Sequence, residues 1–370
     1  MNKKFWATAF TLSGTIIGAG ILGLPYVISQ SGFIIGLFWI LFFGLILGYI
    51  YLCLGEISLR TKENHQLTGY AQKYLGNSGK ILMFMAMLIG IYSALLAYLM
   101  AEGESLSLLL VGSSNYALLF GILFWIVLTL ILGKGLRELK RVETGGILAI
   151  ILIIVSIFFY LIPNIKLTNL LYIQNENFFL PIGVILFSLL GFTSISELRI
   201  EIRGDERNFK NAIIAGIIIP IILYIIFSLA CIGTIGKDIQ EIATLSFGPL
   251  ARLLGIFTMF SAYLIHSFSL KDMFKFDFNY SEKKIFIFVS IMPLIIYFLC
   301  SYFRLFSFIS ILGMGGVLAG GINGILIPVI NLKSKKLSER KPEYQMPMNW
   351  IIIFFISLIF ILGVLFEIII

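Results

Sequence analysis

Charged residues are scarce in this sequence of 370 residues, because aspartate, glutamate, lysine and arginine together make up only 12% of it. Apolar residues make up 59%, and the mean hydropathy is +1.02. A soluble chain of this length could not hide so much apolar surface. Runs of about 20 apolar residues recur along the sequence, each long enough to cross roughly 30 Å of hydrocarbon. The sequence therefore predicts an all-α membrane protein.

Cysteine and histidine are also rare, and this excludes several kinds of site. The three cysteines, Cys53, Cys231 and Cys300, stand apart from one another inside apolar runs. They indicate packing residues and not a disulfide framework. The sequence has two histidines and shows no cluster of histidines and carboxylates with the spacing of metal ligands. We therefore expect no metal site and no cofactor.

Polar breaks divide the sequence into eleven apolar runs, each of which we predict to be a membrane-spanning helix. The predicted spans cover residues 5–30, 32–58, 80–110, 116–133, 143–163, 178–199, 211–233, 250–274, 285–301, 305–331 and 349–369. Spans one to five (5–163) and six to ten (178–331) make up a predicted core over residues 1–331. Residues 332–370 add a cytoplasmic loop and the eleventh span.

Basic residues are distributed unevenly between alternate connections. Of the 27 lysines and arginines, 23 fall on one side of the predicted spans, and only Lys166, Lys237, Arg252 and Arg304 fall on the other. Cytoplasmic connections of membrane proteins are enriched in basic residues, so we expect a cytoplasmic N-terminus and an external C-terminus. The same distribution explains the net charge of +8 without a nucleic-acid partner.

The first span contains an unusual run of small residues, "GTIIGAGILGLPY", from Gly14 to Tyr26. One interpretation is close helix packing, because Gly14 and Gly18 have the spacing of a small-xxx-small pair. The other is an unwound segment, which persists in a membrane only where protein or a wet cavity satisfies its polar groups. The run alone favours packing.

A second interruption lies in the sixth span, at residues 191–196 ("GFTSIS"). Spans one and six hold equivalent positions if spans one to five and six to ten are two repeats. An odd number of spans in each repeat inverts the second repeat. Interrupted helices at corresponding positions of inverted repeats indicate the binding site of a secondary transporter. Helix N-termini favour anions and C-termini favour cations, so two breaks suit a zwitterion such as an amino acid.

These two segments carry a family resemblance. "GTIIGAGILGLPY", followed by "SGFIIGL", resembles the first-span signature of the amino acid/auxin permeases, closest to the bacterial hydroxy and aromatic amino acid permeases. "LLGFTSISELRIEIRGDERNFKNAIIAGIIIPIILY" is similar to that family's sixth span and the loop after it. Over spans one to ten, the resemblance implies a LeuT-like inverted repeat of five plus five spans, with the eleventh as an extra C-terminal helix. It also implies alternating access and symport with Na⁺ or H⁺.

The resemblance further implies roles for the residues of each break. Backbone amides of the first break would bind the substrate carboxylate; they belong to Gly18, Ala19, Gly20 and Ile21. Carbonyls of the second break would bind its ammonium group and shape the side-chain pocket; they belong to Gly191, Phe192, Thr193 and Ser194. The aromatic branch often has a histidine where this chain has Thr193, which argues against an aromatic substrate.

Two residues of the predicted eighth span are candidates for coupling to an ion. "FSAYLIHSFSLKDMF" resembles the family's eighth span, which together with the first holds the ion in LeuT-like transporters. Ser261 would ligate Na⁺ through its oxygen; the alternative is a hydroxyl bonded to its own helix. His266, the only histidine inside a span, would relay a proton. Its alternative is a neutral histidine hydrogen-bonded between helices.

Several further features have both a packing and a functional interpretation. Tyr92 and Tyr98 of the third span either line a pocket or pack, and Glu102 and Glu104 near its outer end are expected to be hydrated. The glycine-rich run from Gly313 to Gly324 is expected to allow close helix packing. The connections 60–79 and 234–249 hold helices of their own or are surface connectors.

Intramembrane catalysis is the rival class. The four aspartates fall in connections or at span ends; they are Asp205, Asp238, Asp272 and Asp277. A serine protease needs a base beside its nucleophile, and His266 has no obvious serine partner on another span. The sequence therefore predicts an ion-coupled secondary transporter of a neutral amino acid in the plasma or inner membrane. An intramembrane enzyme, or a transporter of another small organic cation or zwitterion, is the alternative, and the oligomeric state stays open.

Overall fold

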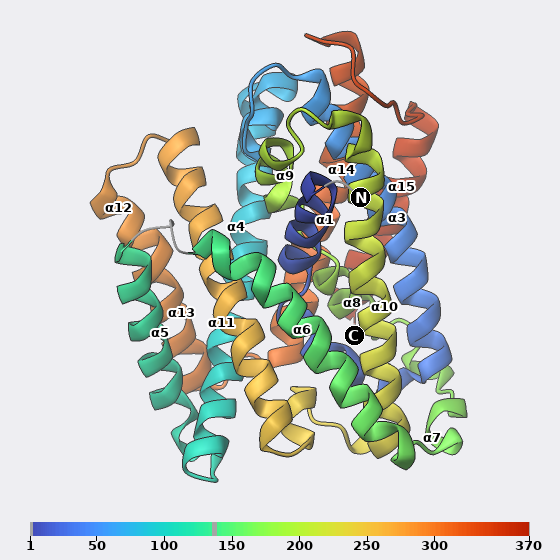
Figure 1. Ribbon diagram of the computed structural model, residues 1–370, viewed down its shortest axis with the longest axis vertical. Coiled ribbons are helices and arrows are strands. Elements are labelled where there is room, and N and C mark those ends of the chain that lie inside the picture. Colours follow the sequence, from blue (N-terminus) through green and yellow to red (C-terminus); the bar gives the residue numbers. More distant parts are fainter. Residues whose placement is uncertain (1–2, 135–138, 370) are drawn as a thin grey trace.

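The computed structural model describes residues 3–134 and 139–369, and the regular elements within them are all helices (Figure 1). In these residues, 10 segments are long and apolar enough to cross a membrane. The bent pair α1 (Lys3–Ile16) and α2 (Gly20–Ser31) makes an eleventh candidate. The predicted all-helical membrane protein is therefore confirmed, with 10 to 11 candidate spans. The inverted repeat stays a prediction.

The spans follow the predicted order. The long helices are α3 (Phe33–Arg60), α4 (Leu67–Leu110), α5 (Ala117–Lys134), α6 (Leu139–Leu161), α10 (Phe209–Ile235), α11 (Pro249–Asp272), α14 (Phe308–Lys336) and α15 (Trp350–Ile369). The predicted ninth span consists of α12 (Glu282–Phe286), the π-helix η9 (Ile287–Ile291) and α13 (Met292–Phe303). The short helix α7 (Leu167–Leu171) precedes the sixth span.

The interrupted spans lie at the centre of the bundle. The predicted sixth span consists of α8 (Ile182–Ser188) and α9 (Ile195–Glu201), and 78% of the residues in its most apolar stretch are buried. In the corresponding stretches of α5 and α15, only 22% of the residues are buried. α1 packs against α10, and α14 packs against α4 and α8. Irregular backbone at membrane depth is tolerated only where protein or a wet cavity encloses it, and both breaks meet that condition.

Connections predicted to share one side of the membrane contact one another. Lys4 Nζ donates a hydrogen bond to the Arg203 carbonyl at 2.6 Å. Glu339, after α14, accepts from the Lys62 amide at 2.8 Å and pairs with Lys73 at 2.6 Å. The hydrogen bond from Lys73 holds the pKa of the Glu339 carboxyl below its usual range. The connections after α3, α9 and α14 therefore lie at one end of the bundle, near the top of Figure 1.

The predicted basic cluster between the fourth and fifth spans is described only in part. Arg137 lies outside the described residues. The orientation of the bundle in the membrane, with a cytoplasmic N-terminus, stays a prediction.

The two long connections differ in structure. Residues 60–79 hold the predicted helix as the first turns of α4, separated from the span by Gly76, whose φ of 77° favours glycine. Residues 234–249 hold two short 3₁₀ turns, η6 (Gly236–Asp238) and η7 (Ala243–Ser246), and not one helix. Ile239 and Ile242 of this connection are 3% and 2% exposed. The second connection is therefore not one regular helix, and its buried isoleucines alternate with exposed residues such as Lys237 and Gln240.

Candidate functional site

The first break separates α1 from α2 by three residues, Ile17 to Ala19, and the half-helices meet at 57°. No side chain caps the start of α2. The first amides of a helix lack partners within it. The Leu22 amide donates to the Ala19 carbonyl at 3.0 Å, and the amides before it are candidates for contact with a ligand or water. Gly20 is pressed against α8, because a Cβ there would lie 2.5 Å from the Ser188 Cα. The first span is thus unwound at the glycine run, and not merely packed closely.

The second break separates α8 from α9 and contains the 3₁₀ turn η4 (Phe192–Ser194). Gly191 lies against the first span, since a Cβ there would be 2.7 Å from Ile16 Cγ1. The Leu189 carbonyl accepts a hydrogen bond from the Tyr51 hydroxyl of α3 at 3.0 Å. The predicted interruption of the sixth span is therefore present, and it touches the first break.

A tyrosine of α10 joins the two breaks. Tyr224 Oη lies 2.9 Å from the Ile16 carbonyl oxygen and 2.7 Å from the Ser188 carbonyl oxygen. These are the last carbonyls of α1 and α8, which have no partner within their own helices. The hydroxyl has one proton, so it donates to one of these carbonyls at a time or shares the proton between them, and it lies at the carbonyl ends of both half-helices. Sequence reasoning did not single out Tyr224, although it ends the stretch that carries the family resemblance, because it lies in an uninterrupted apolar span.

A narrow cavity of about 50 Å³ lies between the two breaks and helices α4, α11 and α14. Six predicted site residues line it: Gly18, Gly20, Gly191, Phe192, Thr193 and His266. Four others do not line it: Ala19, Ile21, Ser194 and Ser261. A buried water needs about 10–15 Å³, so the cavity has room for a few waters. An amino acid would fit only after its walls have moved apart.

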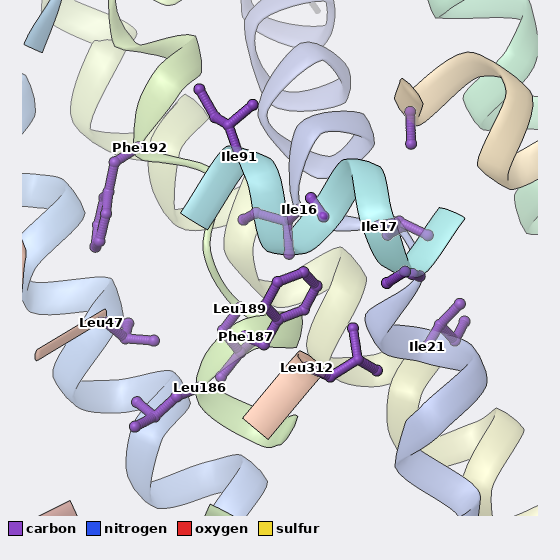
Figure 2. Packing of buried hydrophobic residues seen from close by; sticks show 14 of the residues in the cluster. Ile16, Ile17, Ile21, Leu47, Ile91, Leu186, Phe187, Leu189, Phe192 and Leu312 are labelled. Atoms are coloured by element: carbon purple, nitrogen blue, oxygen red, sulfur yellow. The ribbon is translucent and has the colours of Figure 1, made fainter. Parts of the chain in front are cut away.

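Apolar side chains form most of the cavity wall. Figure 2 shows Ile16 of α1, Phe187 of α8 and Ile91 of α4 in the same part of the core, and all three line the cavity. On α14, the glycine-rich run packs closely on α8, since a Cβ at Gly316 would be 2.6 Å from the Phe187 amide nitrogen. This supports the packing interpretation of that run.

A few polar groups face this apolar cavity. The hydroxyl of Tyr98 lies against Gly18. The ring centroids of Tyr98 and His266 are 5.8 Å apart. His266 Nδ1 is 3.0 Å from the Ala262 carbonyl of its own helix, so this nitrogen carries a proton. Asn323 of α14 also lines the cavity, and sequence reasoning missed it within a run of glycines. Tyr92, by contrast, donates to the Phe288 carbonyl at 2.7 Å and packs elsewhere.

Ser261 lies on α11 away from the cavity. Its hydroxyl is 3.1 Å from the Thr258 carbonyl and 3.3 Å from the Phe257 carbonyl. This is the geometry of a serine bonded back to its own helix. Its role at an ion site stays a prediction.

The two glutamates near the end of α4 have opposite environments. Glu104 lines a second, wider hollow of about 760 Å³ at the far end of the bundle, together with Glu241 and Arg304. Glu102 is 0% exposed, and neither of its carboxyl oxygens has a hydrogen-bond partner. The expectation that Glu102 is hydrated is therefore wrong. The helical period turns it toward the protein interior, one turn beyond Tyr98.

Two interrupted spans that meet at a cavity in the middle of a helical bundle are the arrangement typical of secondary transporters. Comparison with known proteins makes the assignment narrower. The chain belongs to the tryptophan/tyrosine permease family, whose sequence model matches residues 1–264. The resemblance inferred from the first and sixth spans, and the prediction of a permease and not an enzyme, are thereby confirmed.

Individual relatives match parts of the chain at low identity. "Tyrosine-specific transport system 1" of Haemophilus influenzae is 26% identical over 259 residues, which cover 66% of this chain but only 63% of that protein. "Glutamine transporter 2" of Aliivibrio fischeri is 22% identical over 361 residues, 92% of each chain. "Amino acid transporter AVT1H" of Arabidopsis thaliana is 24% identical over 225 residues, 58% of this chain and 52% of that protein.

Proposed function

We propose that the protein is a secondary active transporter that moves a neutral amino acid across the plasma or inner membrane. One observation carries the proposal: both breaks meet at one cavity, and Tyr224 bonds the carbonyl ends of both. Helix starts attract anions and helix ends attract cations, so such a site suits a substrate that carries both charges. Membership of a permease family supports the same conclusion.

Each break has its own part in binding. The amides from Gly18 to Ile21 bind the substrate carboxylate, and the carbonyls from Gly191 to Ser194 bind its ammonium group. The exposure of Gly18, Gly20 and Gly191 to the cavity supports this assignment. Every amino acid carries these two groups, so the breaks recognise the class of substrate and not its side chain.

Transport proceeds by alternating access. The two sets of five spans, at 5–163 and 178–331, act as an inverted repeat, and one bundle of helices rocks against the rest. The narrow cavity and the wide hollow are two distinct spaces, since they share no lining residue among those described. We assign the hollow to the external side and the basic connections to the cytoplasm, which leaves the C-terminus outside.

The coupling ion is Na⁺ or H⁺. Ser261 would hold Na⁺ once its hydroxyl leaves its own helix, and His266 would carry a proton beside the substrate. Glu102 is a third candidate, because an ionised carboxylate without a partner is costly in a buried site. Such a group is stable there only in its protonated form, and it would release the proton when the site opens to water.

The names of the relatives support a neutral substrate, since they are described as transporters of tyrosine and of glutamine. Thr193, in place of the histidine of the aromatic branch, favours a substrate other than an aromatic amino acid. A transporter of another small zwitterion or organic cation is the alternative function.

Uptake into proteoliposomes tests the proposal. The purified protein is reconstituted, and a panel of labelled amino acids is offered under a Na⁺ gradient in one arm and a pH gradient in the other. We expect accumulation of at least one neutral amino acid under one gradient. Accumulation driven by Na⁺ supports Ser261, and accumulation driven only by external acid supports His266 or Glu102. Lack of accumulation of every amino acid by folded protein would refute the proposed function.

A further inference from the structure

Two polar side chains in the cavity have oxygens without a partner in the protein. Thr193 Oγ1 and Asn323 Oδ1 are buried atoms with no hydrogen bond, and Asn323 is only 5% exposed. Among the unpartnered buried side-chain atoms of the described residues, these two belong to residues that line the cavity. Buried polar groups are normally hydrogen-bonded, so each unpartnered one requires an explanation.

Neighbouring hydroxyls show that local bonding was possible. Thr15 also lines the cavity, and its hydroxyl donates to the Thr11 carbonyl at 2.8 Å. Ser194, next to Thr193 in the second break, donates to the Gly191 carbonyl at 2.8 Å. Hydroxyls at both breaks thus find backbone partners, whereas Thr193 does not. Its oxygen is left for a group that enters the cavity.

The fold brings Thr193 and Asn323 to the same part of the cavity. α14 packs on the second break where Gly320 meets Leu190, since a Cβ at Gly320 would be 3.5 Å from Leu190 Cδ2. Asn323 lies three residues after Gly320, which is about one turn of α14. Thr193 lies three residues after Leu190 in the second break. Both therefore lie beside one contact between α14 and the second break, in a wall that is mostly apolar.

We infer that Thr193 and Asn323 form a side-chain subsite that selects amino acids bearing a hydroxyl or amide side chain over apolar ones of the same size. The inference rests on the proposed function. A substrate hydroxyl donates to Asn323 Oδ1 and accepts from the Thr193 hydroxyl, whereas the NH₂ group of a substrate amide donates to both oxygens. In either case both oxygens gain a partner. An apolar side chain leaves both oxygens buried and unpartnered, which is the more costly outcome.

Competition with matched pairs of substrates tests the subsite. Inhibition of labelled uptake in proteoliposomes is measured for threonine against valine, glutamine against methionine, and tyrosine against phenylalanine. For wild type we expect the polar member of at least one pair to bind roughly tenfold better or more, because such sites discriminate strongly against analogues that lack the bond. Thr193→Val and Asn323→Leu should each reduce this ratio toward one while uptake of the apolar member persists.

Two control variants separate this role from a structural one. Thr193→Ser keeps the hydroxyl and should keep the wild-type ratio. Thr129→Val removes a hydroxyl that also lacks a partner, but from α5 and outside the cavity, and should leave the ratio unchanged. Equal binding of the polar and apolar members of every pair by wild type would overturn the subsite, whatever the variants do. The proposed function would survive that result, since it fails only if no amino acid is transported.

Discussion

The two interrupted spans do different things with the same kind of break. The first is three residues long, carries no polar side chain, and brings Gly20 against the backbone of α8. The second is longer, folds into the turn η4, and carries Thr193 with a free hydroxyl. Only the backbone can act at the first break, whereas a side chain can act at the second. Under the proposed function, the first break would recognise what all amino acids share, and the second what distinguishes them.

Gly20 and Gly191 also differ in what surrounds them: backbone lies beside Gly20, and side chains lie beside Gly191. A Cβ at Gly20 would meet the Ser188 backbone, which cannot move without moving α8. A Cβ at Gly191 would meet the Ile16 side chain and the Tyr51 hydroxyl, which can shift by rotation. Gly20 is therefore held more tightly than Gly191, and its substitution should have the larger effect.

The largest expected effect is that of Gly20→Val. The added side chain would push α2 away from α8 and separate the two breaks, so uptake of every substrate should fall below detection. Proteoliposome uptake and size-exclusion chromatography in detergent measure transport and folding. Gly133→Val on α5 is the matched control, because a Cβ at Gly133 would meet nothing within 4 Å. Full uptake by folded Gly20→Val protein would remove the first break from the binding site.

Gly191→Ala should have a smaller effect. Ile16 and Tyr51 can yield to one methyl group, but at the cost of their present packing, so we expect uptake to fall by roughly tenfold. The loss should be similar for all substrates, because the added methyl displaces the Ile16 and Tyr51 side chains and not the free Thr193 hydroxyl. Initial rates of uptake for two unrelated substrates measure this loss. A loss as complete as that of Gly20→Val would contradict the inference that Gly20 is held more tightly than Gly191.

Tyr224→Phe should weaken the link between the breaks. The substitution removes the one hydroxyl donor that the Ile16 and Ser188 carbonyls share, at a cost of about 1–3 kcal/mol. We expect a lower Tm in detergent and a several-fold loss of uptake for all substrates. Tyr263→Phe is the matched control, since the Tyr263 hydroxyl is buried without a hydrogen bond and its removal should be nearly neutral. Equal effects of the two variants would show that the shared hydroxyl is unimportant.

The smallest effect on binding is expected outside both breaks, at the groups proposed for ion coupling. If Glu102 carries the coupling proton, Glu102→Gln should still exchange labelled for unlabelled substrate at near the wild-type rate. It should no longer accumulate substrate under a pH gradient, because glutamine mimics the protonated carboxyl permanently. If His266 carries it, His266→Gln should show this behaviour instead. Accumulation by both variants at the wild-type level would leave Na⁺ as the coupling ion.

Much of the fold could be predicted from sequence because membrane helices are specified locally. Each apolar run must satisfy its own backbone in lipid, so its length and its polar ends define a helix. The exceptions are Gly76, which joins the turns after Leu67 to the third span, and residues 234–249. In that connection Ile239 and Ile242 are buried without a regular helix, which depends on partners elsewhere in the chain.

The candidate site could be predicted only in part. A glycine run marked the first break, and the interruption of an apolar run at residues 191–196 marked the second. Tyr224 and Asn323 carried no comparable signal, since a single polar residue in an apolar span is most often a packing residue. Glu102 was assigned to water from its place near a span end, whereas its position on the helix turns it inward.

The sequence by itself thus determined which segments cross the membrane and where two of them are unable to stay helical, because both properties follow from the local balance of apolar side chains and backbone hydrogen bonds. Only the tertiary structure decided that the two breaks meet, that Tyr224 bonds both, and that Thr193 and Asn323 face one cavity. Those contacts join residues on different spans, and they depend on how the helices pack and not on any local pattern.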